Sequence, residues 1–530
     1  MKPYLKQHKL TVSFIVVFIF LFFFMGYNKL ISTGPCSIHA WRQSDSYSFA
    51  LTYYYGHNKL LEPEILFTGE KDNNKAVSEF PILYFITAKI WKITGVTPAV
   101  LKFIDFLLLL IGLYHLALLA KKLLNSDFWS LYVTLFLFSS PLLGYYSFNF
   151  IPNIPAFGLA LTGLYYSYRF ATSHKNGYLI IYTVIFSFAA LIKVTALFTL
   201  LGALAVLILY YLEDFARYKF QILKVVGSFI VIFGLYYIWY KYSVNYNSKN
   251  LIGIFNQSTM PVWRMSTEKI KEIYDSFYHR VFPQYFNRFT CFILLLLIAL
   301  ISIFRRKINK HARRASIIYF LGFLSFAALF FQGLNYHDYF LIDTLIIFPV
   351  ILLTAILTFK NLFPKLFSSE MTKVIFSLIL ILLLDYNMII TRSHYNPQSR
   401  LVKYNLPLTK RQTDFWDYNY YNLKISDYQY QGIDKYLRSI GVTYSDKVIT
   451  LDDYTPNKTL SLMHLKGFSE YHYSWNYQNE EMIERMIALG AKYLIIRGDS
   501  NSNKPYLSEY TEHLIGKYND INIFKLNGHQ

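Results

Sequence analysis

The groups best suited to chemistry lie close together in the stretch His39-Ala40-Trp41-Arg42-Gln43-Ser44-Asp45-Ser46-Tyr47. It supplies an imidazole, a guanidinium and a carboxylate, which together can move a proton and bind an anion. The following residues 46–57 (SYSFALTYYYGH) are predicted to form a helix with Asp45 near its N-terminus. A carboxylate at that place is also an ordinary helix cap. From these residues alone, capping is the better supported interpretation of Asp45.

Other polar and aromatic side chains recur between apolar segments of the chain. Glu79 stands in Ser78-Glu79-Phe80-Pro81, before a short apolar stretch that it could equally cap. The remaining candidates are Asn153 in NFIPNIP, Lys193 at a break between two apolar runs, and His337, Asp338 and Tyr339 before another run. Together they offer carboxylates, cations and aromatic rings, provided that one surface gathers them.

The composition of the chain is that of a membrane protein. Of 530 residues, 54% are hydrophobic and only 16% charged, whereas soluble domains carry about 25% charged residues. Disordered, collagen-like and coiled-coil chains are excluded on the same grounds. Two cysteines form neither a disulfide framework nor a four-cysteine zinc site. The net charge of +20 fits the basic cytoplasmic loops of a membrane protein, and no basic stripe with interleaved aromatics suggests nucleic acid as a partner.

The apolar runs predict a mainly α, polytopic helix bundle with about 11 spans. They lie near residues 10–31, 100–120, 129–146, 153–171, 178–193, 195–212, 221–241, 290–304, 315–331, 340–358 and 372–390. Residues 80–94 are apolar but short and contain Lys89 and Lys92. If this segment lies along the surface as an interfacial amphipathic helix, all basic clusters fall on the side of the N-terminus, as the positive-inside rule favours.

This topology predicts two parts. Residues 1–391 form the transmembrane domain, whose first outer loop is 32–98, and residues 392–530 form a small extracytoplasmic α/β domain. In that domain SDKVITLDD (445–453) and AKYLIIRGD (491–499) are predicted strands, whereas residues 426–441 and 479–490 are predicted helices, each closed by Gly.

Several blocks resemble a known family in sequence and in order. HAWRQSDSYSFA, SEFPILYFITA, NFIPNIPAF, LIKVTAL, NYHDYFLIDTL, LDDYTPN and GAKYLIIR are similar to blocks of C-type bacterial membrane glycosyltransferases. These enzymes are related to protein O-mannosyltransferases and lipid A aminoarabinose transferases. The resemblance covers nearly the whole chain, and the WRQ-S-D and E-FPILYF blocks are its most specific parts.

The resemblance implies the C-type fold and an inverting transfer of sugar from a polyprenyl-phosphate carrier. The acceptor would be an envelope glycan, lipid or protein at the outer face of the bacterial inner membrane. Asp45 would be the catalytic base, with Glu79 orienting the acceptor or the Asp45 loop. The implied phosphate ligands are Arg42, Lys193 and His337, and the implied substrate contacts are Trp41, Gln43, Asn153, Asp338 and Tyr339. Trp41 could equally anchor the loop at the membrane interface.

The sequence departs from the family beside the base. Many relatives have a second acidic residue there, but the neighbours of Asp45 are Ser44 and Ser46, so a partner must come from elsewhere, such as Glu79. Many relatives also have an acidic residue at Asn153. His39, His57 and His337 with the two carboxylates could bind a divalent cation, but no tight spacing supports this. We therefore assign no metal and no other cofactor, and a divalent cation stays open from the sequence.

Two other functions remain open from the sequence. A transporter or flippase for polyprenyl-linked glycans would place ionisable residues deep in the bundle, and few are found there. Asp105, His115 and Asp343 are better explained as helix contacts. A non-catalytic protein that binds lipid carriers would show binding without turnover.

Overall fold

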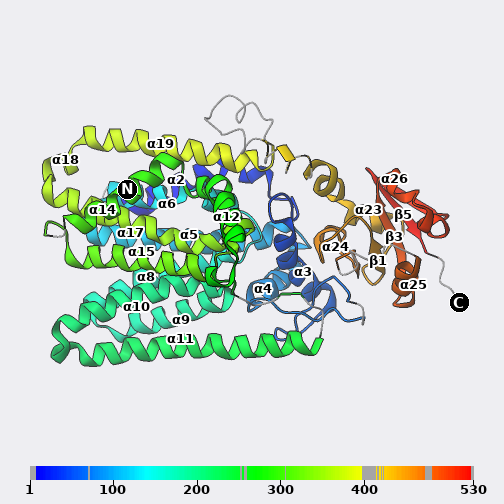
Figure 1. Cartoon of the computed structure of the whole chain (residues 1–530), viewed down its shortest axis with the longest axis horizontal. Helices are drawn as coiled ribbons and strands as arrows, with labels where there is room; N and C mark the ends of the chain where they lie inside the picture. Colours follow the sequence, from blue (N-terminus) through cyan, green and yellow to red (C-terminus); the bar gives the residue numbers. More distant parts are fainter. Residues whose placement is uncertain are drawn as a thin grey trace.

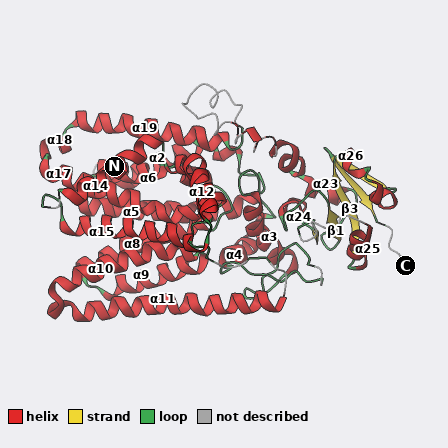
Figure 2. Cartoon of the chain, in the orientation of Figure 1, coloured by secondary structure: helices red, strands yellow, loops and turns green. Residues whose placement is uncertain are grey.

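The computed structural model describes residues 8–69, 72–250, 254–255, 259–304, 306–396, 414, 417–418, 421, 423–471 and 480–526. Residues 2–7 of the basic cluster at Lys2–Lys9, and residue 479 of the helix predicted over 479–490, lie outside this part of the chain. A long bundle of helices occupies one end of the molecule and a small sheet the other, with helices α3 and α4 between them (Figures 1 and 2). The prediction of a mainly helical bundle with a small C-terminal α/β part is confirmed.

Each predicted apolar run corresponds to helix within the bundle. The helices up to the end of the bundle are α2 Lys9–Phe24, α3 Ala40–Gly56, α4 Ile82–Thr94, α5 Pro98–Leu124, α6 Asp127–Phe138, α7 Pro141–Tyr146, α8 Asn153–Ser173, α9 Asn176–Ile192, α10 Leu197–Tyr211, α11 Phe215–Asn250, α12 Thr267–Ser276, α13 Phe282–Tyr285, α14 Arg288–Ile303, α15 Lys310–Leu329, α16 Gly333–Tyr336, α17 Ile347–Leu362, α18 Pro364–Ser368 and α19 Glu370–Ser393.

By length and composition alone, five segments of the described chain could cross a membrane, or six if the bent pair Thr267–Tyr285 and Arg288–Ile303 is one span. One of the five, Val194–Asn250, would be about 85 Å long if straight. It instead contains α10 and α11, which pack side by side (Figure 1). The remaining predicted runs form shorter or less apolar helices in the same bundle.

Three of the predicted helix boundaries are wrong. The first run ends as α helix at Phe24 rather than near residue 31. The run 129–146 forms two helices, α6 and α7, because Pro141 begins a new helix. The run 340–358 begins within a 3₁₀ segment, Asp338–Ile346, and becomes α helix only at Ile347, where α17 starts. The predicted break at Lys193, by contrast, is confirmed, since α9 ends at Ile192 and a 3₁₀ turn follows.

Close helix packing builds the core of the bundle. Gly112 of α5 faces Gly158 of α8, and a Cβ at Gly112 would lie 2.2 Å from the Gly158 carbonyl oxygen. Small residues therefore allow these two backbones to approach, as they do between helices in membranes. Large apolar side chains remain exposed on the outer flank, including Phe20 of α2, Leu223 and Ile238 of α11, and Leu382 of α19. In water such a surface would be costly, and in a bilayer it contacts lipid.

The C-terminal part is a five-stranded mixed sheet flanked by helices. Its strands are β1 Lys447–Thr450, β2 Lys466–Phe468, β3 Ala491–Arg497, β4 Leu514–Tyr518 and β5 Ile521–Lys525, in the order β2-β1-β3-β5-β4. Strands β1, β2 and β3 are parallel, and β5 is antiparallel to β3 and β4. The helices are α22 Tyr428–Tyr430, α23 Ile433–Ser439, α24 Lys458–Met463, α25 Glu480–Ala488 and α26 Asp499–Ser502. Both predicted strands are confirmed.

The segment between α3 and α4 extends this sheet. The Thr68 N–H donates to the Gly467 carbonyl at 2.7 Å, and the Gly467 N–H donates to the Leu66 carbonyl at 3.1 Å. A Cβ at Gly467 would lie 2.0 Å from the Val448 carbonyl oxygen of β1, so only glycine fits. The ion pair between Lys466 and Glu64, at 2.9 Å, ties the same two segments. The residues after α3 are therefore held by the C-terminal part as well as by the bundle.

Candidate active site

Helix α3 begins earlier than the sequence predicts. It starts at Ala40, because His39 adopts the left-handed conformation with φ of 57° and reverses the chain there. The Gln43 side-chain amide donates to the carbonyls of Cys36, at 2.9 Å, and Ile38, at 2.8 Å, and so fixes the preceding turn. Asp45 consequently lies inside the helix rather than at its end. The interpretation of Asp45 as the cap of a helix over 46–57 is wrong.

Asp45 is a buried carboxylate with 3% of its surface exposed. Its Oδ1 accepts a hydrogen bond of 2.8 Å from the Asn457 side-chain amide, which comes from the C-terminal part. Burial raises the pKa of Asp45 to about 7, although Arg42 and Asn457 both act in the opposite direction. A carboxyl group that titrates near neutral pH can accept a proton in a reaction at that pH.

Glu79 is a second buried carboxylate with a different environment. The Arg42 Nη2 lies 2.7 Å from both of its oxygens, and the Ser78 and Tyr84 hydroxyls also donate to it. Burial alone would raise the pKa of Glu79, but Arg42, Lys193 and these hydroxyls together lower it. The interpretation of Glu79 as a helix cap is wrong, since Pro81 stands at the start of α4 and caps it with no side chain.

Lys193 ends α9 and supplies a cation. Its Nζ lies 5.3 Å from the centre of the Phe340 ring, and it is close enough to Arg42, Glu79 and Asp343 to interact with them electrostatically. Among the described residues it has no hydrogen-bond or ion-pair partner. Arg42, by contrast, is already bonded to Glu79 and, at 3.2 Å, to the Ser46 hydroxyl. Lys193 is thus the freer of the two cations to bind an anionic group.

The residues before α17 add a histidine and aspartate cluster. The His39 Nε2 lies 3.1 Å from Asp338 Oδ1, and the Tyr146 hydroxyl donates to the same oxygen at 2.5 Å. The Tyr339 hydroxyl lies 3.3 Å from His337 Nδ1, and the rings of His39 and His337 are 5.8 Å apart. His337 is exposed, whereas Asp338 and Tyr339 are buried.

Asn153 lies deeper, in a polar contact between helices. Its side-chain amide donates to Asp343 Oδ2 at 3.1 Å and to the Thr195 hydroxyl at 3.3 Å. Thr195 in turn donates to the same carboxylate oxygen at 2.5 Å. This explains Asp343 as a helix contact and ties the turn after Lys193 to the segment that begins at Asp338.

The structure gathers most of the predicted site residues in one place. Tyr339 interacts electrostatically with Arg42, Asp45, Asp338 and Glu79, and His337 interacts with Lys193. Trp41 lies at the rim, 40% exposed, with its ring edge against Tyr471 at 5.3 Å. Sequence reasoning named His39 and Ser46 without these contacts, and it missed the partners Tyr84 and Asn457. The only signal for Asn457 was its place in LDDYTPN, a block that carries the family resemblance.

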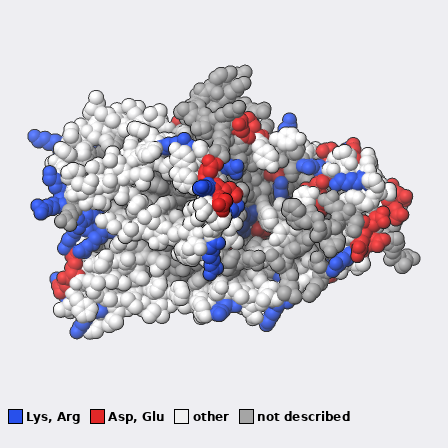
Figure 3. All heavy atoms as spheres, in the orientation of Figure 1, with Lys and Arg blue, Asp and Glu red and all other residues white. Residues whose placement is uncertain are grey.

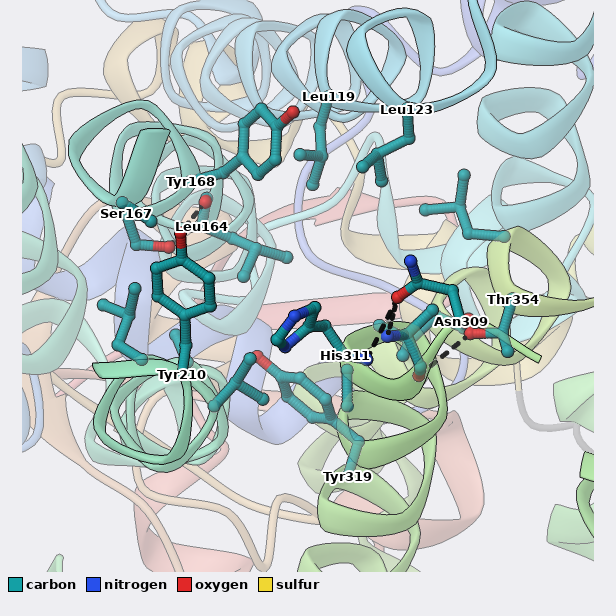
Figure 4. Close-up of a pocket in the computed structure, with 18 of the residues that line it drawn as sticks. Leu119, Leu123, Leu164, Ser167, Tyr168, Tyr210, Asn309, His311, Tyr319 and Thr354 are labelled. Carbon is teal, nitrogen blue, oxygen red and sulfur yellow. Dashed lines mark hydrogen bonds between the residues drawn. The ribbon is translucent and has the colours of Figure 1, made fainter. Parts of the chain in front are cut away.

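Two largely apolar cavities lie among the helices of the bundle. One, of about 340 Å³, is an apolar groove that begins at Val194 and Thr195 and runs between α10 and α15 past Phe198, Gly322 and Phe330. The other, of about 330 Å³, lies among α5, α8, α10, α15 and α17, with His311 and Tyr210 facing into it (Figure 4). Tyr319 lines both. In the described part of the chain, no group of three or more His, Cys, Asp or Glu side chains could hold a metal ion.

Known proteins resemble this chain in part of its sequence and in its fold. Residues 78–239 match the family described as dolichyl-phosphate-mannose-protein mannosyltransferase, and a search among curated protein sequences finds no match. The structure is similar to that of ArnT from Cupriavidus metallidurans in the apo state, with 8% identity, a TM-score of 0.56 and 98% of each chain covered. It is also similar to ArnT from that organism bound to undecaprenyl phosphate, with 10% identity, a TM-score of 0.55 and 98% of each chain covered.

A third similar structure is the oligosaccharyltransferase of Archaeoglobus fulgidus tethered with an acceptor peptide containing the NVT sequon. It is 11% identical, with a TM-score of 0.49, and the match covers 100% of this chain and 75% of that one. The family match and the two ArnT structures confirm the predicted resemblance: the chain has the fold of a C-type membrane glycosyltransferase of the mannosyltransferase and ArnT type.

Proposed function

Starting from this C-type membrane glycosyltransferase fold, we propose that the protein transfers a sugar from a polyprenyl-phosphate carrier to a cell-envelope acceptor. The acceptor is a glycan, lipid or protein, and the anomeric carbon is inverted. The observation that carries the proposal is the convergence, at one end of the bundle, of Asp45, with its pKa raised to about 7, and Lys193, whose ammonium group has no hydrogen-bond or ion-pair partner among the described residues.

The donor site combines a cation with an apolar groove. Lys193 directly precedes Val194 and Thr195, where the groove between α10 and α15 begins. A carrier phosphate on Lys193 would therefore leave its isoprenoid chain at the mouth of an apolar path through the bundle. The ArnT structure bound to undecaprenyl phosphate supports a polyprenyl phosphate as the ligand of this fold.

The reaction needs one base and a stabilised leaving group. Asp45 accepts the proton of an acceptor hydroxyl or amine while that oxygen or nitrogen bonds to C1 of the sugar. The bond between C1 and the phosphate oxygen breaks, and its electron pair leaves with the carrier phosphate. Lys193, aided by Arg42 and His337, stabilises the phosphate charge. Because a phosphate is a good leaving group, the second carboxylic acid used in glycoside hydrolysis is not needed.

The other predicted residues take supporting roles. Glu79 is held ionised by Arg42, so we assign it to fixing Arg42 and the acceptor rather than to proton transfer. Trp41 and Tyr339 offer rings to the sugar, and Asp338 positions His39 beside them. The side-chain amides of Gln43 and Asn153 bond within the protein. We therefore assign them to holding the backbone of the site rather than to contacting the substrate.

The charge distribution supports one orientation of the bundle in the membrane (Figure 3). Lys and Arg side chains gather at the end opposite α3, and the flank between carries few charges on the face shown (Figure 3). The segments at that end, which are α18 and the first turns of α15 and α19, contain Lys310, Arg314, Lys365 and Lys373 (Figure 1). The positive-inside rule assigns this end to the cytoplasm. The Asp45 end and the C-terminal part then lie outside the inner membrane.

Mass analysis of envelope glycolipids and glycoproteins tests the proposal. Cells that lack the protein should lose one sugar from one envelope component, and the wild-type gene should restore it. The missing sugar would identify the donor and acceptor classes. An unchanged set of envelope glycans, with polyprenyl-phosphate sugars equally unchanged, would reject the proposal.

A further inference from the structure

Asn457 is a fully buried side chain from the C-terminal part, 412 residues from Asp45 in sequence. Its Oδ1 accepts hydrogen bonds from the Ser48 hydroxyl and the Phe67 N–H, both at 3.1 Å. Its Nδ2 donates to Asp45 Oδ1 at 2.8 Å. Two donors on the oxygen settle which way the amide points, so the N–H group must face the carboxylate.

The backbone around Asn457 is itself fixed. Asp453 accepts from the Thr455 N–H and from the Thr459 N–H, each at 2.9 Å, and so closes the turn on both sides of Asn457. Helix α24 follows directly and packs on α3. The β-bridge between Phe67 and Gly467 joins the segment after α3 to the C-terminal part beside this turn. The amide is therefore presented to Asp45 by a turn with little freedom to move.

We propose that Asn457 is a positioning residue for the transfer reaction, through which the C-terminal part of the chain completes the active site in the bundle. The inference deepens the proposed function and rests on it. The amide occupies Oδ1 and leaves Oδ2, which accepts no hydrogen bond among the described residues, to take the acceptor proton. Docking of the C-terminal part is then a condition for turnover rather than a separate binding function.

The physical effect of Asn457 acts on the charged form of Asp45. A hydrogen bond to a carboxylate favours its ionised state, and the amide is one of two groups that lower the pKa of this buried acid. Removing the donor should raise the titration midpoint of Asp45 by about one to two pH units. A residue that merely joined two domains would not move that midpoint.

The Asn457→Ala variant removes the donor, and Asn457→Asp replaces it with a second carboxyl group beside Asp45 while keeping an oxygen that accepts from Ser48 and Phe67. Both changes disfavour the ionised form of Asp45. The test titrates full-length protein in lipid nanodiscs by infrared difference spectroscopy and assigns the Asp45 carboxyl signal by its loss in Asp45→Asn. The matched control is Asn501→Asp, which makes the same change at an amide that donates to Asp452 at 2.7 Å within the C-terminal part. If Asn457→Asp does not fold, Asn457→Ala removes the same donor.

We expect the midpoint to rise by about one to two units in Asn457→Asp or Asn457→Ala and to stay unchanged in Asn501→Asp. The acid limb of the transfer rate should move with it, at unchanged affinity for undecaprenyl phosphate. A wild-type midpoint and acid limb in both Asn457 variants, or an equal shift in Asn501→Asp, overturns the inference. If Asp45→Asn itself retains transfer, the proposed function is rejected, because Asp45 is then not the catalytic base. If only the Asn457 variants behave like wild type, the positioning role alone fails.

Discussion

The polar end of the bundle and the cavity of Figure 4 lie among some of the same helices, and yet they differ in almost every physical property. The polar end buries two carboxylates, of which Glu79 accepts from the Arg42 guanidinium at 2.7 Å and Asp45 accepts from the Asn457 amide at 2.8 Å. The cavity has a volume of about 330 Å³, and its walls are mainly Leu, Ala and Tyr side chains.

The difference teaches where to look for chemistry in a membrane enzyme. Buried charges are costly, so a protein that keeps several of them in one place gains something from the arrangement. The polar end is thus the candidate for catalysis. The following changes sharpen or break this contrast.

The largest expected effect is on stability, from Glu79→Gln. Arg42 would keep its charge with only weakened partners, and breaking a buried ion pair costs about 3–5 kcal/mol. Thermal unfolding of the purified protein measures this. The matched control is Glu62→Gln in the same segment, whose exposed pair with Lys59 spans 3.8 Å and is worth about 0–1 kcal/mol. Equal shifts in the two variants would remove the contrast.

Lys193→Ala should weaken binding of undecaprenyl phosphate by roughly 10- to 100-fold, the worth of one hydrogen bond to a charged group. Isothermal titration of the protein in nanodiscs gives the dissociation constant. Lys175→Ala changes a cation at the other end of α9, exposed to solvent, and should leave affinity unaltered. Unchanged affinity in Lys193→Ala rules out its phosphate role.

The rate of transfer should depend on pH through Asp45. Because only the ionised carboxylate accepts a proton, and burial raises its pKa to about 7, kcat/KM should fall about tenfold for each pH unit below 7. Glu79, whose pKa is lowered, should add no limb in that range. A limb at the ordinary carboxyl value near pH 4 would show that Asp45 is not the base.

The smallest expected effects are on carrier binding, and they distinguish the groove between α10 and α15 from the cavity of Figure 4 as the site of the carrier chain. Ser325→Trp narrows the groove between α10 and α15 and should weaken carrier binding by about 3- to 10-fold through lost apolar contact. Ala171→Trp adds the same ring to the wall of the Figure 4 cavity and should leave binding unchanged. The same titration measures both, and the opposite order would place the carrier in the cavity.

The sequence predicted the helices well and the partners of the site poorly. A span needs about 20 apolar residues, so runs such as 100–120 and 372–390 had to coincide with α5 and α19. The start of α3 was missed because it depends on the left-handed turn at His39. The bond between Asn457 and Asp45 was beyond reach, since no local pattern joins residues that far apart. Lys193 was found because a cation between two apolar runs must lie at a break.

Burial of Asp45 also makes the stability of the folded protein depend on pH. Because its pKa is higher in the folded protein than the usual carboxyl value, the folded state loses stability as the pH rises from that value toward about 7. Asp45→Asn removes this loss. The variant should therefore fold at least as stably as wild type above pH 7, which makes it a clean probe of catalysis.

The most direct measurement is the rate of sugar transfer by purified Asp45→Asn, compared with wild type at pH 8 under equal occupancy by the polyprenyl-phosphate donor. Removal of a general base predicts a fall of about 10²- to 10⁴-fold while the protein stays folded and undecaprenyl phosphate binds as before. Transfer at a rate close to that of wild type would contradict the assignment of Asp45 as the base.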